Sequence, residues 1–593
     1  MDGSVGAGQV PTKHTRWGLW IFLAILGVIV LGGFLLVVGF ASLVSTNQVA
    51  VKPDSTLVLS LSNPFQESPP DPIATQLFHA KIYNVFDTVR ALDRAAKDER
   101  IKSLLIEPGM GGGTGLGKLE QIRSAVERFK RSGKPVWAYY EAATTGGYYV
   151  ASCADKVYAP PSGDLILMGP AMALPFFGGT LKKFGIVPQL YHIGAYKSYS
   201  DTFTRTDASD AEKEATNAIL DSFYGQLVDG IAQGRKLSPD QVKAAIDMGF
   251  LWGDQMKQQR LVDDLLYQDQ VEQGLKKING NRERWNRIDM ADYQNDHRIN
   301  LSEGAKKTVA YVVASGDIVS GERGSSNIGS ETLIRWLRKI GEDSGISAVV
   351  LRVDSPGGDA LASDVIWRQV QVLRKSKPVV VSMSDLAASG GYYISMGSDG
   401  IVAEPGTITG SIGVVTGKFV IKGLLDFVDF NMEIMKRGKN SDLFSSYTPY
   451  TPEQEQLIQG QMQSFYKTFV QKAAEGRKKS YEDIDKVGQG RIWSGEDALK
   501  LGLVDKLGGI EEAIALAKEK AGIPPKEPVR IVMYPKPKTI LQAFLEEKTD
   551  SLVRARERSE VPPELWQLYQ EYEQVRPLVS EPFSLYTPIR VTM

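Results

Sequence analysis

The chain contains two copies of one sequence pattern, and this duplication restricts its fold more than any other feature. The segment Thr-Thr-Gly-Gly-Tyr-Tyr at 144–149 matches Ala-Ser-Gly-Gly-Tyr-Tyr at 388–393, which lies 244 positions later. The segment Gly-Ala-Tyr-Lys-Ser at 194–198 matches Gly-Lys-Asn-Ser-Asp at 438–442, again 244 positions later. Two tandem copies of one domain therefore make up most of the chain.

Within each copy, short β-branched runs alternate with amphipathic helical patterns. In the second copy, Ala-Val-Val-Leu-Arg-Val at 348–353 and Pro-Val-Val-Val-Ser-Met at 378–383 are typical of buried strands. Residues 364–375 between them have the apolar spacing of a helix. Such strand–helix–strand units favour a largely parallel sheet with helices on its faces, so the chain is predicted to be an α/β protein.

The composition excludes several classes of site. Because 69 Lys and Arg balance 70 Asp and Glu, no excess of positive charge favours nucleic acid as a partner. The single cysteine, Cys153, allows no intrachain disulfide and no cysteine-based metal site, and we expect it in the core. The four histidines are His14, His79, His192 and His297. They form no cluster with carboxylates, so no metal site and no cofactor is predicted.

The N-terminal part of the chain predicts a membrane anchor. Residues 17–44 are 28 residues without a charge, and a helix of that length spans roughly 42 Å, enough to cross a hydrocarbon core of about 30 Å. A cleaved signal peptide is the alternative, although its apolar core is shorter, about 7–15 residues. Because Lys13 and Arg16 precede the run, the positive-inside rule leaves the short tail in the cytoplasm and the rest of the chain outside.

These observations give a predicted domain organisation. It consists of a cytoplasmic tail (1–16), a transmembrane anchor (17–44), a first domain copy (47–270), a polar linker (271–305), a second domain copy (306–535) and a C-terminal tail (536–593).

Ser389 is a candidate nucleophile, because it stands at a predicted strand-to-helix turn and is followed by two glycines. The amide of Gly390 and one from Gly357 or Gly358 could stabilise an oxyanion beside it. The alternative is a tight turn in which small residues serve packing alone. The first copy has Thr145 at the position of Ser389.

The base that would activate Ser389 is not a histidine of the second copy, since none lies beyond His297. Where the second copy has Ser441, the first has Lys197. Each copy thus retains one half of a serine–lysine pair, and we expect one composite site across the two copies. A lysine base must be neutral, which requires burial of its amine to lower the pKa from about 10.4. The alternative for Lys197 is an ordinary solvated surface lysine.

Three motifs resemble those of the signal peptide peptidase A (protease IV) family in its long, duplicated form. They are Asp-Ser-Pro-Gly-Gly (354–358), Ala-Ala-Ser-Gly-Gly-Tyr-Tyr (387–393) and Gly-Ala-Tyr-Lys-Ser (194–198), and the resemblance extends over residues 50–530. It implies tandem Clp-protease/crotonase-like domains and a serine endopeptidase that degrades signal peptides left in the membrane. One departure is Ser384-Asp385-Leu386 before the serine, where the family pattern has glycines and a methionine.

The resemblance also assigns roles to single residues. It implies that Ser389 is the nucleophile, that Lys197 is the general base and that Ser411 hydrogen-bonds the lysine. It implies that Gly358 and Gly390 supply the oxyanion amides. The family further implies a homotetramer on the extracytoplasmic face of the bacterial inner membrane, with peptides as its substrates.

Three other classes of protein share some of these sequence features. A crotonase-type acyl-CoA enzyme shares the fold but generally relies on acidic residues. A non-catalytic membrane scaffold would leave Ser389 and Lys197 dispensable. A penicillin-binding serine enzyme needs a Ser-x-x-Lys motif, and the match at 464–467 lies in a predicted helix with no Lys-Thr-Gly after it, so this class is rejected.

Overall fold

The computed structural model describes residue 3 and residues 50–69, 82–280, 284–296, 299–322, 327–536 and 584–585. The predicted membrane anchor (17–44) lies outside the described residues, as does the predicted cytoplasmic tail apart from residue 3. In the part of the chain that is described, no helix is both long and apolar enough to cross a membrane.

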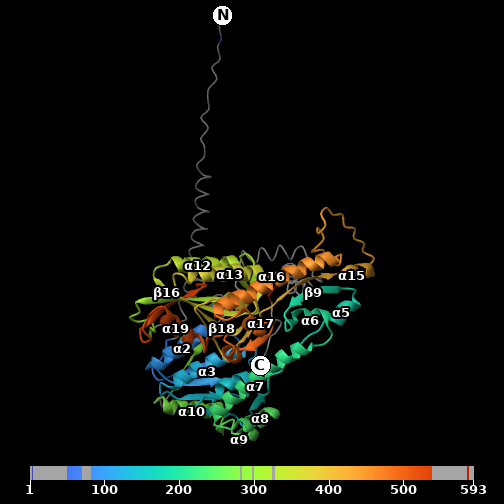
Figure 1. Ribbon diagram of the computed structural model, residues 1–593. Coiled ribbons are helices and arrows are strands. Elements are labelled where there is room, and N and C mark those ends of the chain that lie inside the picture. The colour runs from blue at the N-terminus through green and yellow to red at the C-terminus, as the bar shows by residue number, and fades with distance from the viewer. Residues whose placement is uncertain are drawn as a thin grey trace.

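The first copy alternates strands and helices as predicted (Figure 1). Its elements are β1 (Ser55–Ser60), β2 (Phe65–Gln66), β3 (Tyr83–Asn84), α2 (Val85–Lys97), β4 (Ile101–Glu107), α3 (Leu116–Lys130), β5 (Val136–Tyr139), β6 (Ala142–Ala143), α4 (Thr145–Ala151), β7 (Lys156–Ala159), β8 (Asp164–Leu167), α5 (Gly178–Lys183), β9 (Val187–Ile193), the 3-10 helix η2 (Ser198–Ser200), α6 (Asp201–Thr204), α7 (Asp210–Arg235), α8 (Pro239–Asp247), β10 (Gly249–Trp252), α9 (Asp254–Gln258), β11 (Asp264–Leu265), α10 (Gln268–Ile278), β12 (Asn286–Asp289) and α11 (Met290–Tyr293).

The second copy follows the same order. Its elements are β13 (Lys307–Ser315), β14 (Asp317–Val319), β15 (Asn327–Gly329), α12 (Ser330–Glu342), β16 (Ile346–Ser355), β17 (Gly358–Asp359), α13 (Ala360–Leu373), β18 (Val379–Ala388), α14 (Gly390–Ser395), β19 (Gly400–Ala403), β20 (Ile408–Gly410), β21 (Val414–Val420), α15 (Lys422–Phe427), α16 (Pro452–Arg477), α17 (Tyr481–Val487), β22 (Ile492–Ser494), α18 (Gly495–Lys500), β23 (Lys506–Leu507), α19 (Ile510–Lys520) and β24 (Val529–Tyr534), and a last strand, β25 (Ser584–Leu585), lies in the C-terminal tail.

Each copy is built on a mainly parallel sheet. The first has the order β11-β7-β5-β4-β1-β12, and the second has the order β22-β20-β18-β16-β13-β24. In the second sheet β13, β16 and β18 pair in parallel through long buried runs, as their β-branched sequences predict. The predicted mixed α/β fold is therefore confirmed.

The long helices α7 and α16 show how closely the two copies correspond. Ser209 and Thr451 cap the N-termini of α7 and α16, and Thr451 and Gln454 form a reciprocal capping box. Both helices have 26 residues and end at a lysine in the left-handed conformation, Lys236 or Lys478. The same local signals therefore begin and end the same helix twice.

One feature differs from the predicted boundaries. Within the predicted linker, 271–305, strand β12 pairs in parallel with β1 at the edge of the first sheet. Val271 and Leu275 of α10, in the same stretch, are buried against Val58 and Leu105. The polar composition that suggested a linker belongs to an edge strand and a surface helix, which expose one side to solvent.

One hydrophobic cluster extends across both copies, and a second cluster consists of buried residues of the second copy. Buried residues of β1, β4, α2 and α3 form a continuous cluster with those of β13 and α19. Across this contact the rings of Phe86 in α2 and Tyr311 in β13 lie 4.5 Å apart. Figure 1 shows α12, α13 and α16 at one end of the molecule and α8, α9 and α10 at the other. Because the core is continuous, the copies hold a fixed relative position.

A strand of the first copy crosses into the second. β9 pairs antiparallel with β21 from Val187↔Val420 to Ile193↔Val414. Figure 1 shows α5, α6 and β9 beside α15, on the same side of the molecule. Lys197 follows four residues after the end of β9, so this pairing carries it to the second copy.

Candidate active site

Ser389 occupies the turn between β18 and α14 in a strained backbone conformation. Its φ is +55° and its ψ is −112°, a region that non-glycine residues rarely adopt. Its amide donates to the carbonyl of Gly410 at 2.8 Å, and its carbonyl accepts from Tyr393 at 2.8 Å. The turn is thus fixed from both sides, and the side chain of Ser389 is held in one place.

The Lys197 amine contacts two serine hydroxyls of the other copy. Its Nζ lies 2.8 Å from Oγ of Ser389 and 3.0 Å from Oγ of Ser411. Ser411 has a φ of +52° and donates its amide to the carbonyl of Arg491 at 2.7 Å. The structure therefore brings together three predicted site residues, Lys197, Ser389 and Ser411.

Glycines of the second copy make room for the lysine. A Cβ on Gly490, which has a φ of +76°, would lie 2.5 Å from Cβ of Lys197. A Cβ on Gly413 would lie 3.1 Å from its Cδ. The preceding residue, Tyr196, donates its amide to the carbonyl of Gln489 at 2.8 Å. The sequence prediction did not include Gly413 and Gly490, and their only sequence signal is glycine itself.

The amine of Lys197 is removed from water. The residue is 1% exposed, and no carboxylate among the described residues pairs with it. Burial lowers the pKa of Lys197 from 10.5 to about 7. A substantial fraction of this lysine is therefore neutral near pH 7 and able to accept a proton from a hydroxyl.

The predicted oxyanion glycines meet backbone to backbone. Gly357 and Gly358 follow β16, whose neighbour β18 leads to Ser389 and Gly390, and the carboxyl ends of parallel neighbours lie at one sheet edge. A Cβ on Gly390 would lie 3.1 Å from the amide nitrogen of Gly358 and 3.0 Å from Cα of Gly357. Only glycine allows this approach, which places the two turns against each other.

The repeat partners of Ser389 and Lys197 have different surroundings: Thr145 in the first copy corresponds to Ser389, and Ser441 in the second copy corresponds to Lys197. Thr145 begins α4 with no positive φ, and its hydroxyl accepts from the amide of Met168 at 2.8 Å and donates to the carbonyl of the same residue at 3.1 Å. Ser441 lies on an exposed loop, where its hydroxyl donates to the carbonyl of Gly438 at 3.1 Å. Neither residue has a serine or lysine partner among its hydrogen bonds in the described chain.

Comparison with known proteins assigns the family. The sequence model of peptidase family S49 matches the chain twice, over residues 128–281 and 371–524. The chain belongs to peptidase family S49. The two matches have equal length and lie one in each copy, so the duplication seen in the sequence and in the fold is a duplication of the S49 domain.

Several known proteins are similar in sequence to this chain over most of its length. The chloroplastic serine protease SPPA of Arabidopsis thaliana is 37% identical over 462 residues, which cover 76% of this chain and 68% of that protein. Protease 4 of Salmonella typhi is 33% identical, covering 79% and 76%. Protease 4 of Haemophilus influenzae is 30% identical, covering 85% and 86%. Among solved structures, ClpP1 from Listeria monocytogenes aligns with a TM-score of 0.22 at 16% identity, covering 34% of this chain and 91% of that one, too low a similarity to add to the assignment.

This S49 chain is accordingly a serine peptidase. The Ser-x-x-Lys match at 464–467, the motif that a penicillin-binding enzyme would need, lies in the middle of α16. His79 and His297 lie outside the described residues, and His192 shares a hydrogen bond of 2.8 Å between its Nδ1 and Oγ of Ser200. Within the described ranges no group of His, Cys, Asp and Glu side chains could hold a metal ion.

Cys153 has the structural role that the sequence predicts for it. It is 4% exposed, and its thiol donates to the carbonyl of Val150 at 3.1 Å. Burial raises the pKa of Cys153 to about 11, which keeps it an unreactive thiol.

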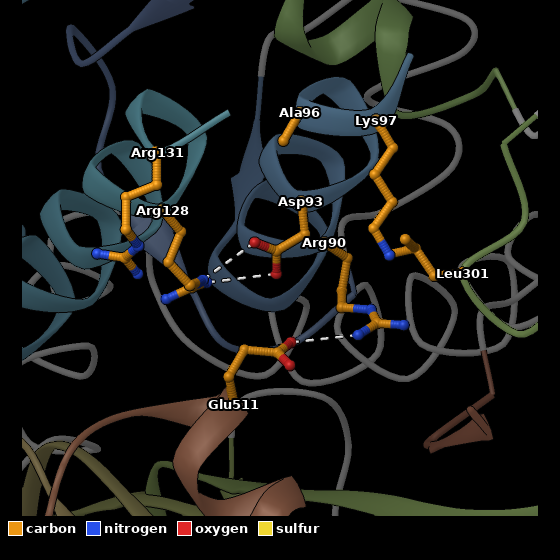
Figure 2. A pocket seen from close by; sticks show the side chains of 8 residues that line it. All are labelled: Arg90, Asp93, Ala96, Lys97, Arg128, Arg131, Leu301 and Glu511. Carbon is orange, nitrogen blue, oxygen red and sulfur yellow. Dashed lines mark hydrogen bonds and ion pairs between the residues drawn. The ribbon is translucent and has the colours of Figure 1, made fainter. Parts of the chain in front are cut away.

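A surface hollow of the S49 chain has no part in this site. About 450 Å³ in volume, it lies where α2 and α3 face α19 (Figure 2). Four of its charged side chains form two ion pairs: Arg128 with Asp93 at 3.0 Å, and Arg90 with Glu511 at 3.2 Å across the two copies. The hollow contributes to the contact between the copies.

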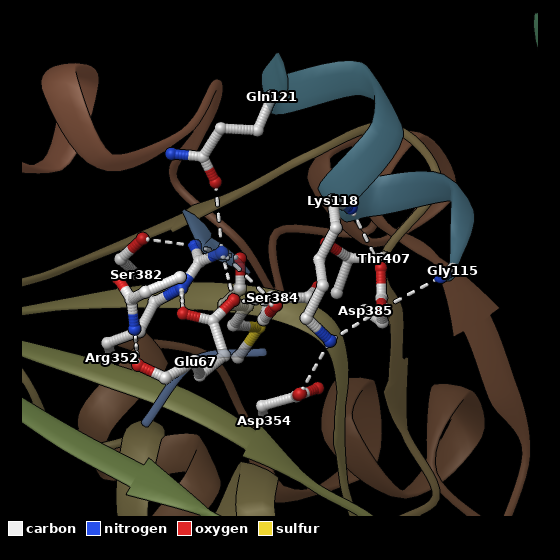
Figure 3. A network of polar contacts seen from close by, with 12 residues as sticks. Glu67, Gly115, Lys118, Gln121, Arg352, Asp354, Ser382, Ser384, Asp385 and Thr407 are labelled. Carbon is white, nitrogen blue, oxygen red and sulfur yellow. Dashed lines mark hydrogen bonds and ion pairs between the residues drawn. The ribbon is translucent and has the colours of Figure 1, made fainter. Parts of the chain in front are cut away.

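The copies also share a buried polar network that the sequence did not reveal (Figure 3). Arg352 of β16 and Glu67 of the first copy form an ion pair of 2.8 Å in which neither side chain is exposed. Arg352 also donates to Gln121 of α3 at 2.9 Å and to Ser384 at 3.1 Å. Ser384 and its neighbour Asp385 belong to the stretch that departs from the family pattern.

Proposed function

We propose that this chain is a membrane-anchored endopeptidase in which Ser389 is the nucleophile and Lys197 the general base. The observation that supports it most directly is the 2.8 Å contact between Nζ of a fully buried lysine and Oγ of a serine at a strained turn. A buried amine with a pKa of about 7 suits a base that operates near neutral pH.

The proposed reaction begins when neutral Lys197 accepts the proton of the Ser389 hydroxyl. The serine oxygen then forms a bond to the carbonyl carbon of the peptide, and the carbonyl oxygen becomes an oxyanion. The amides of Gly358 and Gly390 would donate to that oxyanion. As the C–N bond breaks, the lysine ammonium returns its proton to the departing amine. Lys197 then takes a proton from water, whose oxygen forms a bond to the acyl carbon. As the ester bond to Ser389 breaks, the lysine ammonium returns that proton to the serine oxygen. Ser411 orients the amine throughout.

The substrate would bind as an extended strand beside Gly358. This position already accepts extended backbone, because β25 pairs antiparallel with β17 at Gly358↔Leu585 and with β21 at Ser584↔Val415. A peptide in that position would add a strand to the sheet, with its carbonyl groups close to Ser389. Peptides that are unfolded or lack secondary structure meet this requirement best.

We further propose that both copies are of the Clp-protease/crotonase-like type, because each has a strand-to-helix turn with paired glycines.

The proposed setting is the outer face of a bacterial inner membrane. The uncharged run 17–44 would anchor the chain, with the preceding positive charges in the cytoplasm. Relatives include a putative signal peptide peptidase SppA of Enterococcus faecium, 35% identical over 228 residues. Signal peptides released in the membrane are apolar and extended on leaving it, and we propose them as the substrates.

A homo-oligomer is proposed from the duplication itself. By the repeat offset of 244, residues 431–437 correspond to β9 and residues 170–176 correspond to β21, but neither segment forms a strand here. Residues 431–437 are exposed throughout, with Met435 85% exposed. A second copy of the chain could pair its 170–176 with these residues as β9 pairs with β21, and repeated head-to-tail contacts of this kind close a ring such as a homotetramer. Light scattering of the full chain against Met435→Asp tests this contact, since loss of the ring in the variant is expected.

The test of the catalytic proposal is labelling of the full-length protein, in detergent, with a fluorophosphonate probe. Wild type and Thr145→Ala should label, whereas Ser389→Ala and Lys197→Met should not, with circular dichroism confirming that each is folded. Cleavage of a synthetic signal peptide should follow the same pattern. If Ser389→Ala still labels and cleaves, or Lys197→Met matches wild type, the assignment is wrong. If wild type cleaves other peptides but not signal peptides, the proposed substrate is wrong, while the proposed catalytic residues still hold.

A further inference from the structure

Two carboxylates meet at an irregularity between the strands that lead to the active site. The pairing of β16 with β18 shifts register between Val353↔Met383 and Ser355↔Ala387. Asp354 lies at that shift on β16, and Asp385 lies opposite on β18. Asp354 also accepts from the backbone amide of Leu386 at 3.2 Å, which holds the irregular part of β18 against β16. Two neighbouring negative charges here would repel unless a cation lay between them.

The cation is Lys118, which comes from the first copy. Its Nζ donates to Oδ2 of Asp354 at 2.7 Å and to Oδ2 of Asp385 at 2.6 Å (Figure 3). The side chain of Lys118 is only 8% exposed. Burial opposes the charged form, but the carboxylates of Asp354 and Asp385 raise the pKa of Lys118 above its usual value. The ammonium therefore stays charged and bridges both strands.

Asp385 also fixes the helix that supplies this lysine. Its carboxylate accepts from the amide of Lys118 at 2.8 Å and from that of Gly115 at 3.2 Å, and so caps the N-terminus of α3. No side chain of its own caps this helix. A Cβ on Gly115 would lie 2.3 Å from Cγ of Asp385, so the contact requires glycine there. The aspartate and the lysine thus position each other.

Both carboxylates lie just before the reacting groups. Asp385 precedes Ser389 by four residues, and Asp354 precedes Gly358 by four. We propose that Lys118 is a positioning residue, which couples the oxyanion turn to the nucleophile turn from the opposite copy. Activity would then depend on contact between the copies at two places, through Lys197 directly and through Lys118 indirectly. This inference rests on the proposed function of Ser389.

The repeat supports a role linked to the nucleophile rather than to the fold in general. The first copy has Gly109 at the position of Asp354 and an exposed Glu141 at the position of Asp385. The carboxylate pair therefore occurs in the copy that carries the serine and is absent from the copy that carries threonine. If the pair served only to build the sheet, both copies would need it.

The experiment measures kcat and KM for an internally quenched peptide with full-length Lys118→Met, Lys118→Arg and wild type. Lys130→Met is the matched control, because Lys130 lies on the same helix and forms a more exposed pair of 3.0 Å with Asp155. We expect Lys118→Met to lose about 10- to 100-fold in kcat with little change in KM, since displaced reacting groups slow chemistry more than binding. Lys118→Arg should recover most of the loss, and Lys130→Met should match wild type.

The pH profile separates positioning from an effect on the base. Burial alone lowers the pKa of Lys197, so the acid limb of kcat/KM should keep its midpoint in Lys118→Met. If Lys118→Met does not fold, Asp385→Asn replaces it, because its amide oxygen can still cap α3 while the charge is lost. The inference is overturned if kcat of the folded variant stays within about twofold of wild type, if only KM changes, or if Lys118→Arg is no better than Lys118→Met. An active Ser389→Ala would instead overturn the proposed function.

Discussion

Nζ of Lys197 and Oγ of Ser389 lie 2.8 Å apart although 192 residues separate them in the chain. The two residues come from different copies of one domain, and each copy has lost the partner that the other retains. Strand β9 accounts for this arrangement, because its pairing with β21 delivers the lysine into the second copy. We infer that duplication was followed by complementary loss, which would leave one composite site instead of two.

The pH dependence of activity should report the buried lysine. If the neutral amine of Lys197 is the base, as proposed, its pKa of about 7 makes kcat/KM rise as the pH increases through about 7 and then level off. The measurement is kcat/KM for a peptide substrate between pH 5 and pH 9. A value of kcat/KM that still rises about tenfold per pH unit at pH 9, as expected for a base with the ordinary lysine pKa of 10.5, would show that Lys197 does not titrate near pH 7.

Replacing the base should make the protein more stable while abolishing its activity. At pH 6 the folded wild type holds a buried ammonium, and a pKa lowered from 10.5 to about 7 corresponds to roughly 4–5 kcal/mol against it. Lys197→Met removes that cost but also loses the contacts with Ser389 and Ser411, so we expect a net gain of about 2 kcal/mol in the free energy of unfolding.

This gain should depend on pH in a defined direction. Between pH 7 and 10.5 the unfolded wild type holds the lysine proton and the folded wild type does not, so its stability rises with pH. The stability advantage of Lys197→Met should therefore be largest below pH 7. It should fall by about 1.4 kcal/mol per pH unit above pH 7, so that wild type becomes the more stable protein before pH 10. Urea unfolding at several pH values measures it, and a difference that is independent of pH would contradict the buried ammonium.

Ser411→Ala should lower the pKa of the base and the rate together. Its hydroxyl accepts from Lys197 at 3.0 Å and stabilises the ammonium, so its loss favours the neutral amine. We expect the acid limb to move to lower pH while maximal kcat falls about tenfold, because the amine is less well oriented. The exposed Ser441→Ala is the control and should change neither quantity.

Gly490→Ala should damage catalysis by displacing the lysine. The added Cβ would lie 2.5 Å from Cβ and 2.6 Å from the amide nitrogen of Lys197. We expect a loss of at least about tenfold in kcat. Gly133→Ala is a matched control, because its φ of +83° resembles the +76° of Gly490 but nothing lies within 4 Å of its added Cβ. Similar kcat losses in both variants would show that backbone strain alone is responsible.

Glu67→Gln should destabilise the contact between the copies. It leaves Arg352, whose side chain is fully buried, without its carboxylate partner, and removing one member of a buried pair costs about 3–5 kcal/mol. Thermal and urea unfolding of the full chain would measure the loss. Asp426→Asn, which breaks a surface pair with Lys422 at 2.7 Å, should change stability by less than about 1 kcal/mol. Equal effects of the two variants would contradict the importance of burial.

Local patterns in the sequence determined much of this protein. The repeat, the β-branched runs and the capping signals predicted an α/β fold in two copies, since such signals act over a few residues and do not depend on distant partners. Ser389 stands where the first copy has Thr145, and Lys197 stands where the second copy has Ser441. These differences between the two copies indicated both residues without any other sequence for comparison. The two turns by themselves indicated Gly390 and either Gly357 or Gly358, and the resemblance to a family selected Gly358 and added Ser411.

Only the tertiary structure decided what surrounds these residues. That β12 completes the first sheet, that Gly413 and Gly490 make room for Lys197, and that Lys118 bridges Asp354 and Asp385 all depend on contacts between segments far apart in the chain. Burial is likewise a property of the packed molecule: a lysine in a sequence is charged and solvated, and desolvation by the assembled copies lowers the pKa of Lys197 to about 7. The sequence thus determined which groups are available, and packing determined their protonation and their distances.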